Sequence, residues 1–302
     1  MKKFNLDIQE YTGWKKWQPT DSELSEFFVT KKVPFELLEN EYLIIQDPIT
    51  SSIFYYCNEH GKLRRLHGSP IKTFESKTIE EDSDEPSVKK KKYSRGKKTE
   101  IFPRNDEQVC AFDLVKDPTK TIKVLSGKWG TGKTMILVNA ALDALRVGLF
   151  EQIVWIRNNV DVKDTKDLGA LPGDTIDKLL PFLGPFIDHA GEAAVRTMLA
   201  KESLRVEPLQ SLRGRNFSNT LIMCSEAENL TKEHLQLIIA RAADGSQVWI
   251  DGDNRQRDRA SFEKSRGIET LIDRLKGNEL FGYVHLTKSE RSATAALADL
   301  LD

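Results

Sequence analysis

The pattern of hydrophobic and polar positions divides the chain into two unlike parts. Before about residue 75, runs rich in β-branched and aromatic residues at 41–46 and 52–57 flank an Asp-Pro turn signal. From about residue 101, apolar runs of strand length alternate with helical segments. These apolar runs lie at 122–126, 153–156, 220–224 and 247–250. Alternating strands and helices predict an α/β fold with a mainly parallel sheet, which binds its ligands at the carboxyl ends of the strands.

The first part, residues 1–74, predicts a small β-rich module, of which a barrel is one form. A short helix is expected to begin with Asp21 or Ser22 as its cap. The aromatic residues of the module lie near Arg64 and Arg65 in the sequence, which leaves two interpretations open. They fill a small core, or they stack on the bases of a single strand whose phosphates contact the arginines.

Residues 75–100 change in character. Acidic residues are concentrated at 80–85 and basic residues at 89–98, and a proline and a glycine break any periodicity. This composition predicts a charged flexible linker that leads into a domain over residues 101–302. The basic half also suits contact with a phosphate backbone, and the two interpretations are compatible.

The composition is that of a globular protein with a well-solvated surface, since 39% of the 302 residues are hydrophobic and 30% are charged. The net charge of −1 neither favours nor excludes nucleic acid. The three cysteines are widely spaced and fit a reduced cytoplasm, where we expect the protein to work. No apolar run has the length of a membrane span and no signal peptide is evident, so we expect no membrane partner.

The stretch 127–134 carries the strongest chemical signal. Its sequence fits the P-loop pattern, and it lies between an apolar strand and an apolar helix, as that motif requires. Glycines allow backbone N–H groups to turn toward a polyphosphate. Lys133 supplies charge for the β and γ phosphates, and Thr134 supplies a hydroxyl for Mg²⁺. The predicted nucleotide-binding residues of the loop are Gly127, Trp129, Gly130, Thr131, Gly132, Lys133 and Thr134.

Polar residues follow two later apolar strands of this domain. The run 221–226 has the layout of a Walker B segment, which predicts Glu226 as the general base that activates water. The preceding position, where an aspartate that organises Mg²⁺ is expected, holds Ser225. After the next strand, Asp253 and Gln256 are placed to contact the γ-phosphate or its water. A polar turn is the alternative for this last pair.

Two further residues complete the candidate site. A further strand is expected to end at about Leu286, and Arg291 follows it, where arginine suits the dispersed charge of phosphoryl transfer. A surface ion pair is the alternative. Gln108 lies shortly before the first strand of the domain, where an amide suits the edge of an adenine ring.

Residues 101–302 resemble the PhoH family of P-loop ATPases, relatives of superfamily 1 helicase motors. The segments that carry the resemblance are 105–108, 127–134, 168–174, 212–215, 225–229, 252–256 and 289–292. The segments 11–13 and 38–45, together with 279–281 and 286–288, carry a second resemblance. Through them residues 11–74 are similar to the linking module of PhoH-like proteins that carry an N-terminal PIN ribonuclease domain. Because the chain begins at about that module, we expect the PIN domain to be absent and the chain not to cut RNA.

The resemblance implies a RecA-like core that uses ATP and Mg²⁺. It also implies single-stranded RNA as the polymer and a homo-oligomer, with a hexameric ring as one form. It assigns Gln108 to adenine, Glu226 to water activation and Arg291 to the transition state. It assigns Asp253 and Gln256 to sensing the γ-phosphate, and the P-loop lysine and threonine to phosphate and Mg²⁺.

Ser225 departs from the family pattern, which has Asp-Glu-Ala-Gln-Asn where this chain has Ser-Glu-Ala-Glu-Asn at 225–229. A hydroxyl replaces a carboxylate near Mg²⁺, so one negative charge is lost. Ser225 stays a candidate metal-site residue that orients a metal-bound water through a hydrogen bond, and Asp253 is the candidate that compensates in part. We expect ATP binding to survive and hydrolysis to slow, at a cost of about 2–4 kcal/mol by analogy with the loss of one charge-stabilising group. If the lost charge limits chemistry, Ser225→Asp raises turnover.

Three functions are therefore open. The first is an ATP-driven, helicase-like or translocase-like motor on RNA. The second is a nucleotide-bound switch or assembly subunit with weakened hydrolysis, which acts with a separate partner such as a nuclease. The third is a phosphotransferase, for which no acceptor pocket is marked in the sequence.

Overall fold

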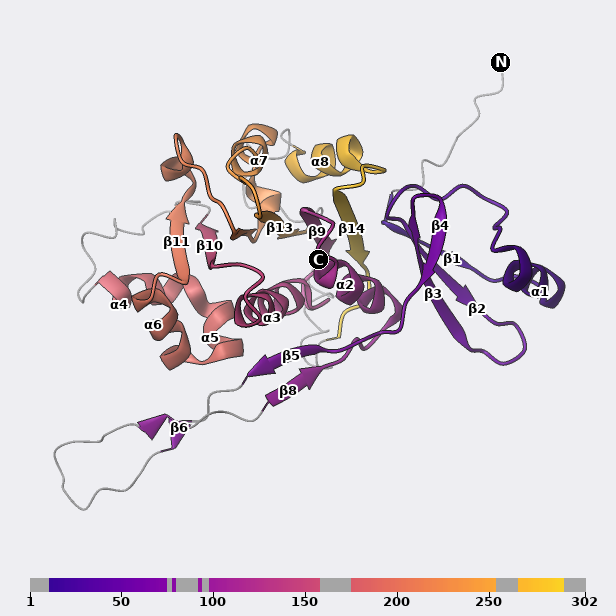
Figure 1. Ribbon diagram of the computed structural model, residues 1–302, viewed down its shortest axis with the longest axis horizontal. Helices are drawn as coiled ribbons and strands as arrows, with labels where there is room; N and C mark the ends of the chain where they lie inside the picture. The colour runs from indigo at the N-terminus through magenta and orange to yellow at the C-terminus, as the bar shows by residue number, and fades with distance from the viewer. Residues whose placement is uncertain are drawn as a thin grey trace, which may run out of the picture.

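The computed structural model describes residues 11–74, 78–79, 92–93, 98–157, 175–253 and 266–290. Figure 1 shows a large α/β domain beside a smaller module that contains the first four strands. Within these residues, none of the helices combines the length and the apolar character that crossing a bilayer requires.

The large domain is built on a six-stranded sheet in which neighbouring strands all run parallel. The strand order is β11-β10-β12-β13-β9-β14. The strands are β9 (Ile122–Gly127), β10 (Gln152–Arg157), β11 (Leu204–Pro208), β12 (Thr220–Cys224), β13 (Gln247–Gly252) and β14 (Phe281–Leu286). The predicted α/β fold with a mainly parallel sheet is confirmed. Because all strands point the same way, the ends of β9, β13 and β12 meet at one edge of the sheet.

Helices cover both faces of this sheet, and the alternation of side chains along each strand builds two hydrophobic cores. Leu125 of β9 packs in the core that includes residues of α2, α3, α5 and α6. Val124, one residue earlier, packs in the core with residues of α7 and α8. The helices are α2 (Asp106–Lys116), α3 (Lys133–Arg146), α4 (Thr175–Leu179), α5 (Gly184–Ala190), α6 (Glu192–Ala200), α7 (Lys232–Ile239) and α8 (Gly267–Leu275). Short 3-10 segments are η2 (Leu180–Leu183), η3 (Leu209–Leu212) and η4 (Ala227–Asn229).

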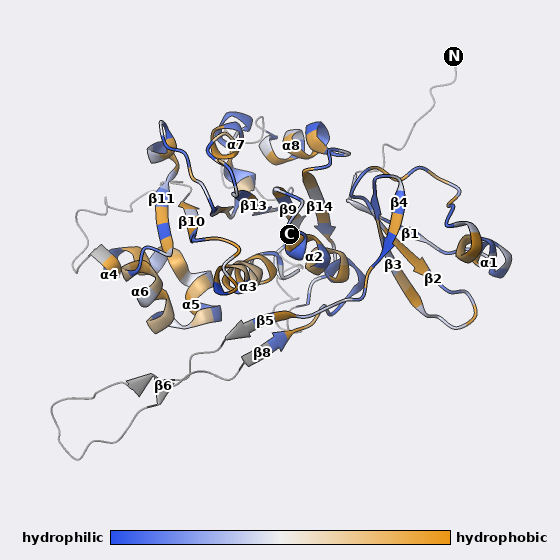
Figure 2. Cartoon of the chain, viewed as in Figure 1, coloured by the Kyte–Doolittle hydropathy of each residue, from blue (hydrophilic) through white to orange (hydrophobic). Residues whose placement is uncertain are grey.

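The small module is a four-stranded sheet in the order β1-β2-β3-β4. Its strands are β1 (Trp14–Trp17), β2 (Tyr42–Gln46), β3 (Ile53–Glu59) and β4 (Lys62–Arg65). β1 runs parallel to β2, and the other two pairings are antiparallel. The β-rich module is confirmed, but within the described residues its edge strands do not pair with each other, so the sheet is open and not a barrel. Figure 2 shows the hydrophobic character of β2 and β3 and the polar residues of β4.

Helix α1 (Asp21–Thr30) confirms the short helix expected in the module. Its N-cap is Thr20, so the prediction of Asp21 or Ser22 as the cap is wrong. Thr20 and Glu23 form a capping box, in which the Glu23 carboxylate accepts the Thr20 backbone N–H at 2.7 Å and the Thr20 hydroxyl accepts the Glu23 N–H at 3.4 Å. This reciprocal pair satisfies two backbone groups, which a cap one residue later does not achieve.

The module packs directly on the large domain. Residues of β2 belong to the same hydrophobic core as residues of α2 and α3. The Asn40 side-chain amide donates to the carbonyl oxygens of Asn278 and Phe281, at 3.0 and 2.9 Å. A Cβ atom added at Gly13 would lie 1.9 Å from the carbonyl oxygen of Tyr283, so this close approach of two backbones requires glycine.

The segment predicted as a flexible linker, residues 75–100, is described only in part. β5 (Ile71–Phe74) pairs antiparallel with β8 (Lys98–Ile101), and β6 (Thr78–Ile79) pairs antiparallel with β7 (Lys92–Tyr93) (Figure 1). Most of the acidic and basic residues between these strands lie outside the described residues. The division of the chain at residues 75 and 101 stays a prediction.

Candidate nucleotide-binding site

The P-loop, residues 127–134, connects the carboxyl end of β9 to the first turn of α3. Three of its glycines have positive φ, with values of 144° at Gly127, 73° at Gly130 and 92° at Gly132. A Cβ atom at Gly127 would lie 2.0 Å from the carbonyl oxygen of Leu286 in β14, so a side chain there would displace one of the two strands. Because α3 begins inside the loop, its N-terminal N–H groups and positive dipole end are available to an anion.

Lys133 and Thr134, which the motif assigns to phosphate and Mg²⁺, both have identified partners. The Lys133 ammonium donates to the carbonyl oxygens of Gly127 and Lys128 at 2.5 and 2.8 Å, so its charge lies over the loop. The Thr134 hydroxyl donates to Oδ2 of Asp251. The P-loop is therefore tied through Thr134 to a carboxylate on β13.

These groups line a cavity of about 430 Å³ at the carboxyl edge of the sheet. Its walls come from the P-loop, α5 and the ends of β12 and β13. The predicted site residues that line it are Trp129, Gly130, Gly132, Lys133, Thr134, Ser225, Glu226 and Asp253. Asp188, His189, Glu228 and Asp251 line it as well, and the sequence interpretation did not assign them to the site. Residues far apart in the chain thus meet at the strand ends, as the parallel sheet predicts.

Glu226, the predicted general base, follows β12 with an unusual backbone conformation. Its φ and ψ of 56° and 42° lie in the left-handed region, which costs a non-glycine residue about 1–3 kcal/mol and often occurs at functional sites. Glu228 accepts a hydrogen bond from the Asp253 backbone N–H at 2.9 Å. Burial raises the pKa of Glu228 to about 7. Glu228 therefore holds the backbone of Asp253, which lines the same cavity as the exposed Glu226.

Asp251 is the acidic residue that contacts the P-loop. Its side chain is buried, and burial raises its pKa although hydrogen bonds from Thr134 and Ser225 and the charge of Lys133 act in the opposite direction. The sequence interpretation treated the carboxylate as lost at Ser225 and named Asp253 as the compensating group. The structure instead brings Asp251 against the Thr134 hydroxyl. Strand order is the signal that would have revealed this contact, because β13 and not β12 is the neighbour of β9.

Gln108 lies in α2, beside the P-loop. Its Nε2 donates to the carbonyl oxygen of Thr131 at 3.0 Å, and its Oε1 accepts the backbone N–H of Arg104 at 2.9 Å. The side chain is buried. These contacts hold the start of α2 against the P-loop, and the contact of Gln108 with adenine stays a prediction.

The segment that leads to Arg291 is anchored on the P-loop. The Glu290 backbone N–H donates to the carbonyl oxygen of Gly130 at 2.9 Å, and the Glu290 carboxylate accepts the Asn105 side-chain amide at 2.8 Å. Arg291 itself and Gln256 lie outside the described residues, so their roles stay predictions. The anchored segment nevertheless ends next to the loop that is expected to hold the phosphates.

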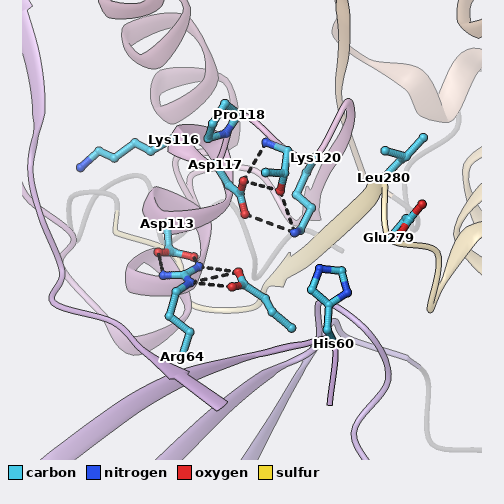
Figure 3. A pocket seen from close by; sticks show the side chains of 11 residues that line it. His60, Arg64, Asp113, Lys116, Asp117, Pro118, Lys120, Glu279 and Leu280 are labelled. Atoms are coloured by element: carbon cyan, nitrogen blue, oxygen red, sulfur yellow. Dashed lines mark hydrogen bonds and ion pairs between the residues drawn. The ribbon is translucent and has the colours of Figure 1, made fainter. Parts of the chain in front are cut away.

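A second cavity, of about 490 Å³, lies between the module and the large domain (Figure 3). Its lining residues Lys120 and Leu280 shortly precede β9 and β14, so it lies at the opposite edge of the sheet from the P-loop. The Arg64 guanidinium pairs with the carboxylates of Asp113 and Glu59, at 2.7 and 2.9 Å. The Arg64–Asp113 pair joins β4 of the module to α2 of the large domain, whereas Glu59 belongs to β3 of the module itself. We therefore assign this cavity to docking of the module and not to nucleotide binding.

Comparisons with known proteins agree with this geometry. The family model for PhoH-like proteins matches residues 100–298. A protein of Mycolicibacterium smegmatis named PhoH2 is 33% identical over 218 residues, which cover 70% of this chain and 50% of that protein. A protein of Bacillus subtilis, also named PhoH2, is 33% identical over 213 residues, which cover 67% of this chain and 48% of that protein. This chain thus spans about half the length of these curated relatives.

Among solved structures, the Hef helicase domain of Pyrococcus furiosus aligns with 62% of this chain and 38% of its own. The TM-score is 0.34 and the sequence identity is 15%. A similarity of this level is too low to bear on function.

Proposed function

The chain belongs to the PhoH family, as a P-loop NTPase, and on this basis we propose that it binds ATP with Mg²⁺, hydrolyses ATP and works as a motor on single-stranded RNA. The observation that carries the proposal is the cavity in which Lys133 and Thr134 face the ends of β12 and β13. Backbone N–H groups at a helix N-terminus suit a polyphosphate. Hydroxyl and carboxylate oxygens suit Mg²⁺, a hard cation that prefers oxygen ligands.

The proposed chemistry divides among the residues of this cavity. Mg²⁺ held beside the Thr134 hydroxyl would neutralise charge on the phosphates, including the charge that develops during phosphoryl transfer. Lys133 adds a second positive charge. Glu226, exposed after the end of β12, accepts a proton from the attacking water. Asp253, held through its backbone by Glu228, faces the same cavity and is the proposed γ-phosphate contact.

The surface of the module supports RNA as the polymer. Phe27 is fully buried in the core of the module, whereas Phe28 is 39% exposed. The Phe28 and Phe54 rings meet edge to face with centroids 5.2 Å apart. The Arg65 guanidinium lies 5.4 Å from the Phe54 ring centre, and the Lys31 ammonium lies 5.2 Å from that of Phe28. Aromatic rings beside cations suit stacked bases and their phosphates. Our proposal is that Phe28 and Phe54 contact the strand, whereas Phe27 fills the core of the module.

A switch is the second candidate function, and Ser225 favours it. This residue leaves no carboxylate directly before Glu226, so hydrolysis is slow in this account and the ATP-bound form recruits a partner such as a separate nuclease. The motor predicts that single-stranded RNA stimulates hydrolysis. The switch predicts tight ATP binding, little turnover and no stimulation.

The test is the rate of ATP hydrolysis with and without single-stranded RNA. Lys133→Ala, which removes the phosphate-binding charge, sets the background, and Lys201→Ala, at the exposed end of α6, controls for the loss of a lysine. The motor requires RNA-stimulated hydrolysis in the wild type and in Lys201→Ala but not in Lys133→Ala. ATP binding without hydrolysis supports the switch, and absence of ATP binding refutes both. Transfer of labelled phosphate from ATP to a small molecule would favour a phosphotransferase instead.

A further inference from the structure

The ends of β12 and β13 place a hydroxyl and a carboxylate side by side. The two strands are parallel neighbours, and their register pairs Cys224 with Ile250. Ser225 and Asp251 are the residues that follow this pair, so they come next to each other at the edge that carries the P-loop. On its other side Asp251 pairs with Leu125 of β9. Asp251 therefore lies one strand nearer to the P-loop than Ser225 does.

The contacts of Asp251 all converge on the proposed phosphate site. Its Oδ2 accepts the Thr134 hydroxyl, and Ser225 also donates a hydrogen bond to this carboxylate. The residue is 3% exposed and lines the 430 Å³ cavity. Among the described residues, no lysine, arginine or histidine lies within ion-pair distance of the Asp251 carboxylate. The charge of Lys133 acts on this carboxylate from a greater distance. A buried carboxylate whose side-chain hydrogen bonds come from neutral hydroxyl groups is costly unless a cation lies beside it.

We propose that Asp251 is the positioning carboxylate for Mg²⁺ in this chain, and that the acidic group has moved from the end of β12 to the end of β13. Ser225 is then its hydrogen-bond partner and not a defective metal residue. Asp251 orients the Thr134 hydroxyl and supplies the negative charge that position 225 lacks. The inference rests on the proposed function, because it concerns the same nucleotide site.

This move of the acidic group from residue 225 to residue 251 explains why the site has one carboxylate and one hydroxyl at the two strand ends. Residue 225 and residue 251 each offer an oxygen to the same small volume beside Thr134. Placing aspartate at either position supplies the same net charge there. Placing aspartate at both would bring two carboxylates together, and placing it at neither would leave Thr134 without an anionic partner.

The test measures how Mg²⁺ changes the affinity for a fluorescent, non-hydrolysable ATP analogue. Four chains are compared, namely the wild type, Asp251→Asn, the exchanged variant Ser225→Asp with Asp251→Ser, and the control Asp244→Asn. Asp244 is exposed and lies just before the amino end of β13, so the control makes the same chemical change on the far side of the sheet. Binding with Mg²⁺ is compared with binding in a chelator, and Mn²⁺ resonance spectra of each complex report on the metal directly.

We expect the gain in affinity on adding Mg²⁺ to fall roughly tenfold or more in Asp251→Asn, as for other groups that orient a metal ligand. Affinity in the chelator should not change, and the exchanged variant should recover the Mg²⁺-dependent gain. A full gain in Asp251→Asn overturns this inference alone. If Asp251→Asn loses the Mg²⁺-dependent gain and the exchanged variant does not recover it, the claim that the carboxylate can occupy either position is overturned.

Two other results are decisive. If Asp251→Asn and the exchanged variant both lose affinity for the ATP analogue in the chelator, Asp251 maintains the fold of the site and the inference is overturned. If the wild type shows no nucleotide binding that depends on Mg²⁺, the proposed function fails, and the inference fails with it.

Discussion

Lys123 is a buried lysine in β9, four residues before the P-loop begins, and it predicts a measurable pH dependence of folding. The side chain is 1% exposed. Its ammonium donates to the Val115 carbonyl oxygen at 2.9 Å and lies 4.7 Å from the centre of the Trp249 ring. Burial lowers its pKa to about 7, because removal from water disfavours the charged form.

The size of the effect follows from linkage between proton binding and folding. An unfolded lysine has a pKa of about 10.4, so between pH 7 and pH 10 the unfolded chain binds one proton more than the folded chain at Lys123. Stability therefore rises with pH in this window, by up to about 1.4 kcal/mol per unit. Between pH 6 and pH 9 this group adds about 2–3 kcal/mol to the free energy of unfolding. Well below pH 7, Lys123 is protonated in both the folded and the unfolded chain, and the cost of burying its charge is fully present.

Urea unfolding of the wild type and of Lys123→Met, at several pH values from 6 to 9, measures this contribution. Methionine keeps an unbranched apolar chain but cannot titrate. We expect the advantage of Lys123→Met over the wild type to shrink by about 2–3 kcal/mol from pH 6 to pH 9. Lys201→Met, at an exposed position, controls for the loss of one charge. Parallel stability curves for the wild type and Lys123→Met would refute the reasoning.

Three further predictions concern the P-loop, the metal site and the docked module. Gly127→Ala should lose nucleotide binding and lower the free energy of unfolding by about 1–3 kcal/mol, because φ at this glycine is 144° and a Cβ atom would meet β14. Nucleotide titration checks the loss of binding, and urea unfolding checks the loss of stability. Ser225→Asp alone should slow hydrolysis, the reverse of the expectation from sequence, because it adds a second carboxylate beside Asp251; faster steady-state hydrolysis would contradict this. Arg64→Met should lower the free energy of unfolding by about 1 kcal/mol, since this partly exposed arginine pairs with Asp113. Limited proteolysis should then release the module sooner than in the wild type. An unchanged cleavage rate would count against a role of Arg64 in docking the module.

The P-loop could be predicted from sequence because its demands are local. A strand, a glycine-rich turn and a helix follow one another within residues 122–146. The apolar residues, the glycines and the lysine and threonine of this stretch each indicate their part of the motif without reference to distant residues. The parallel sheet could be predicted in part for the same reason, since the apolar runs at 122–126, 153–156, 220–224 and 247–250 each identify one strand, whereas β11 at 204–208 was not predicted. The fold class and the position of the phosphate loop therefore needed no knowledge of distant contacts.

Asp251 and Lys123 could not be interpreted in this way, because their surroundings depend on the order of the strands. Asp251 acquires its contact with Thr134 only because β13 pairs with β9. A lysine in an apolar run gives no sign that its neighbours on two other elements bury it. The docking of the module through Asn40 likewise joins residues more than 230 positions apart, which no local pattern encodes.

Single-turnover hydrolysis of ATP by the wild type and by Glu226→Gln tests the central claim most directly. The substitution keeps the size of the side chain but removes its negative charge and its ability to accept a proton. The account predicts that both chains bind ATP with Mg²⁺ equally well and that the variant hydrolyses it about 10²-fold to 10⁴-fold more slowly. Equal rates in the two chains, or hydrolysis in neither, would contradict the claim that this cavity is an ATPase site.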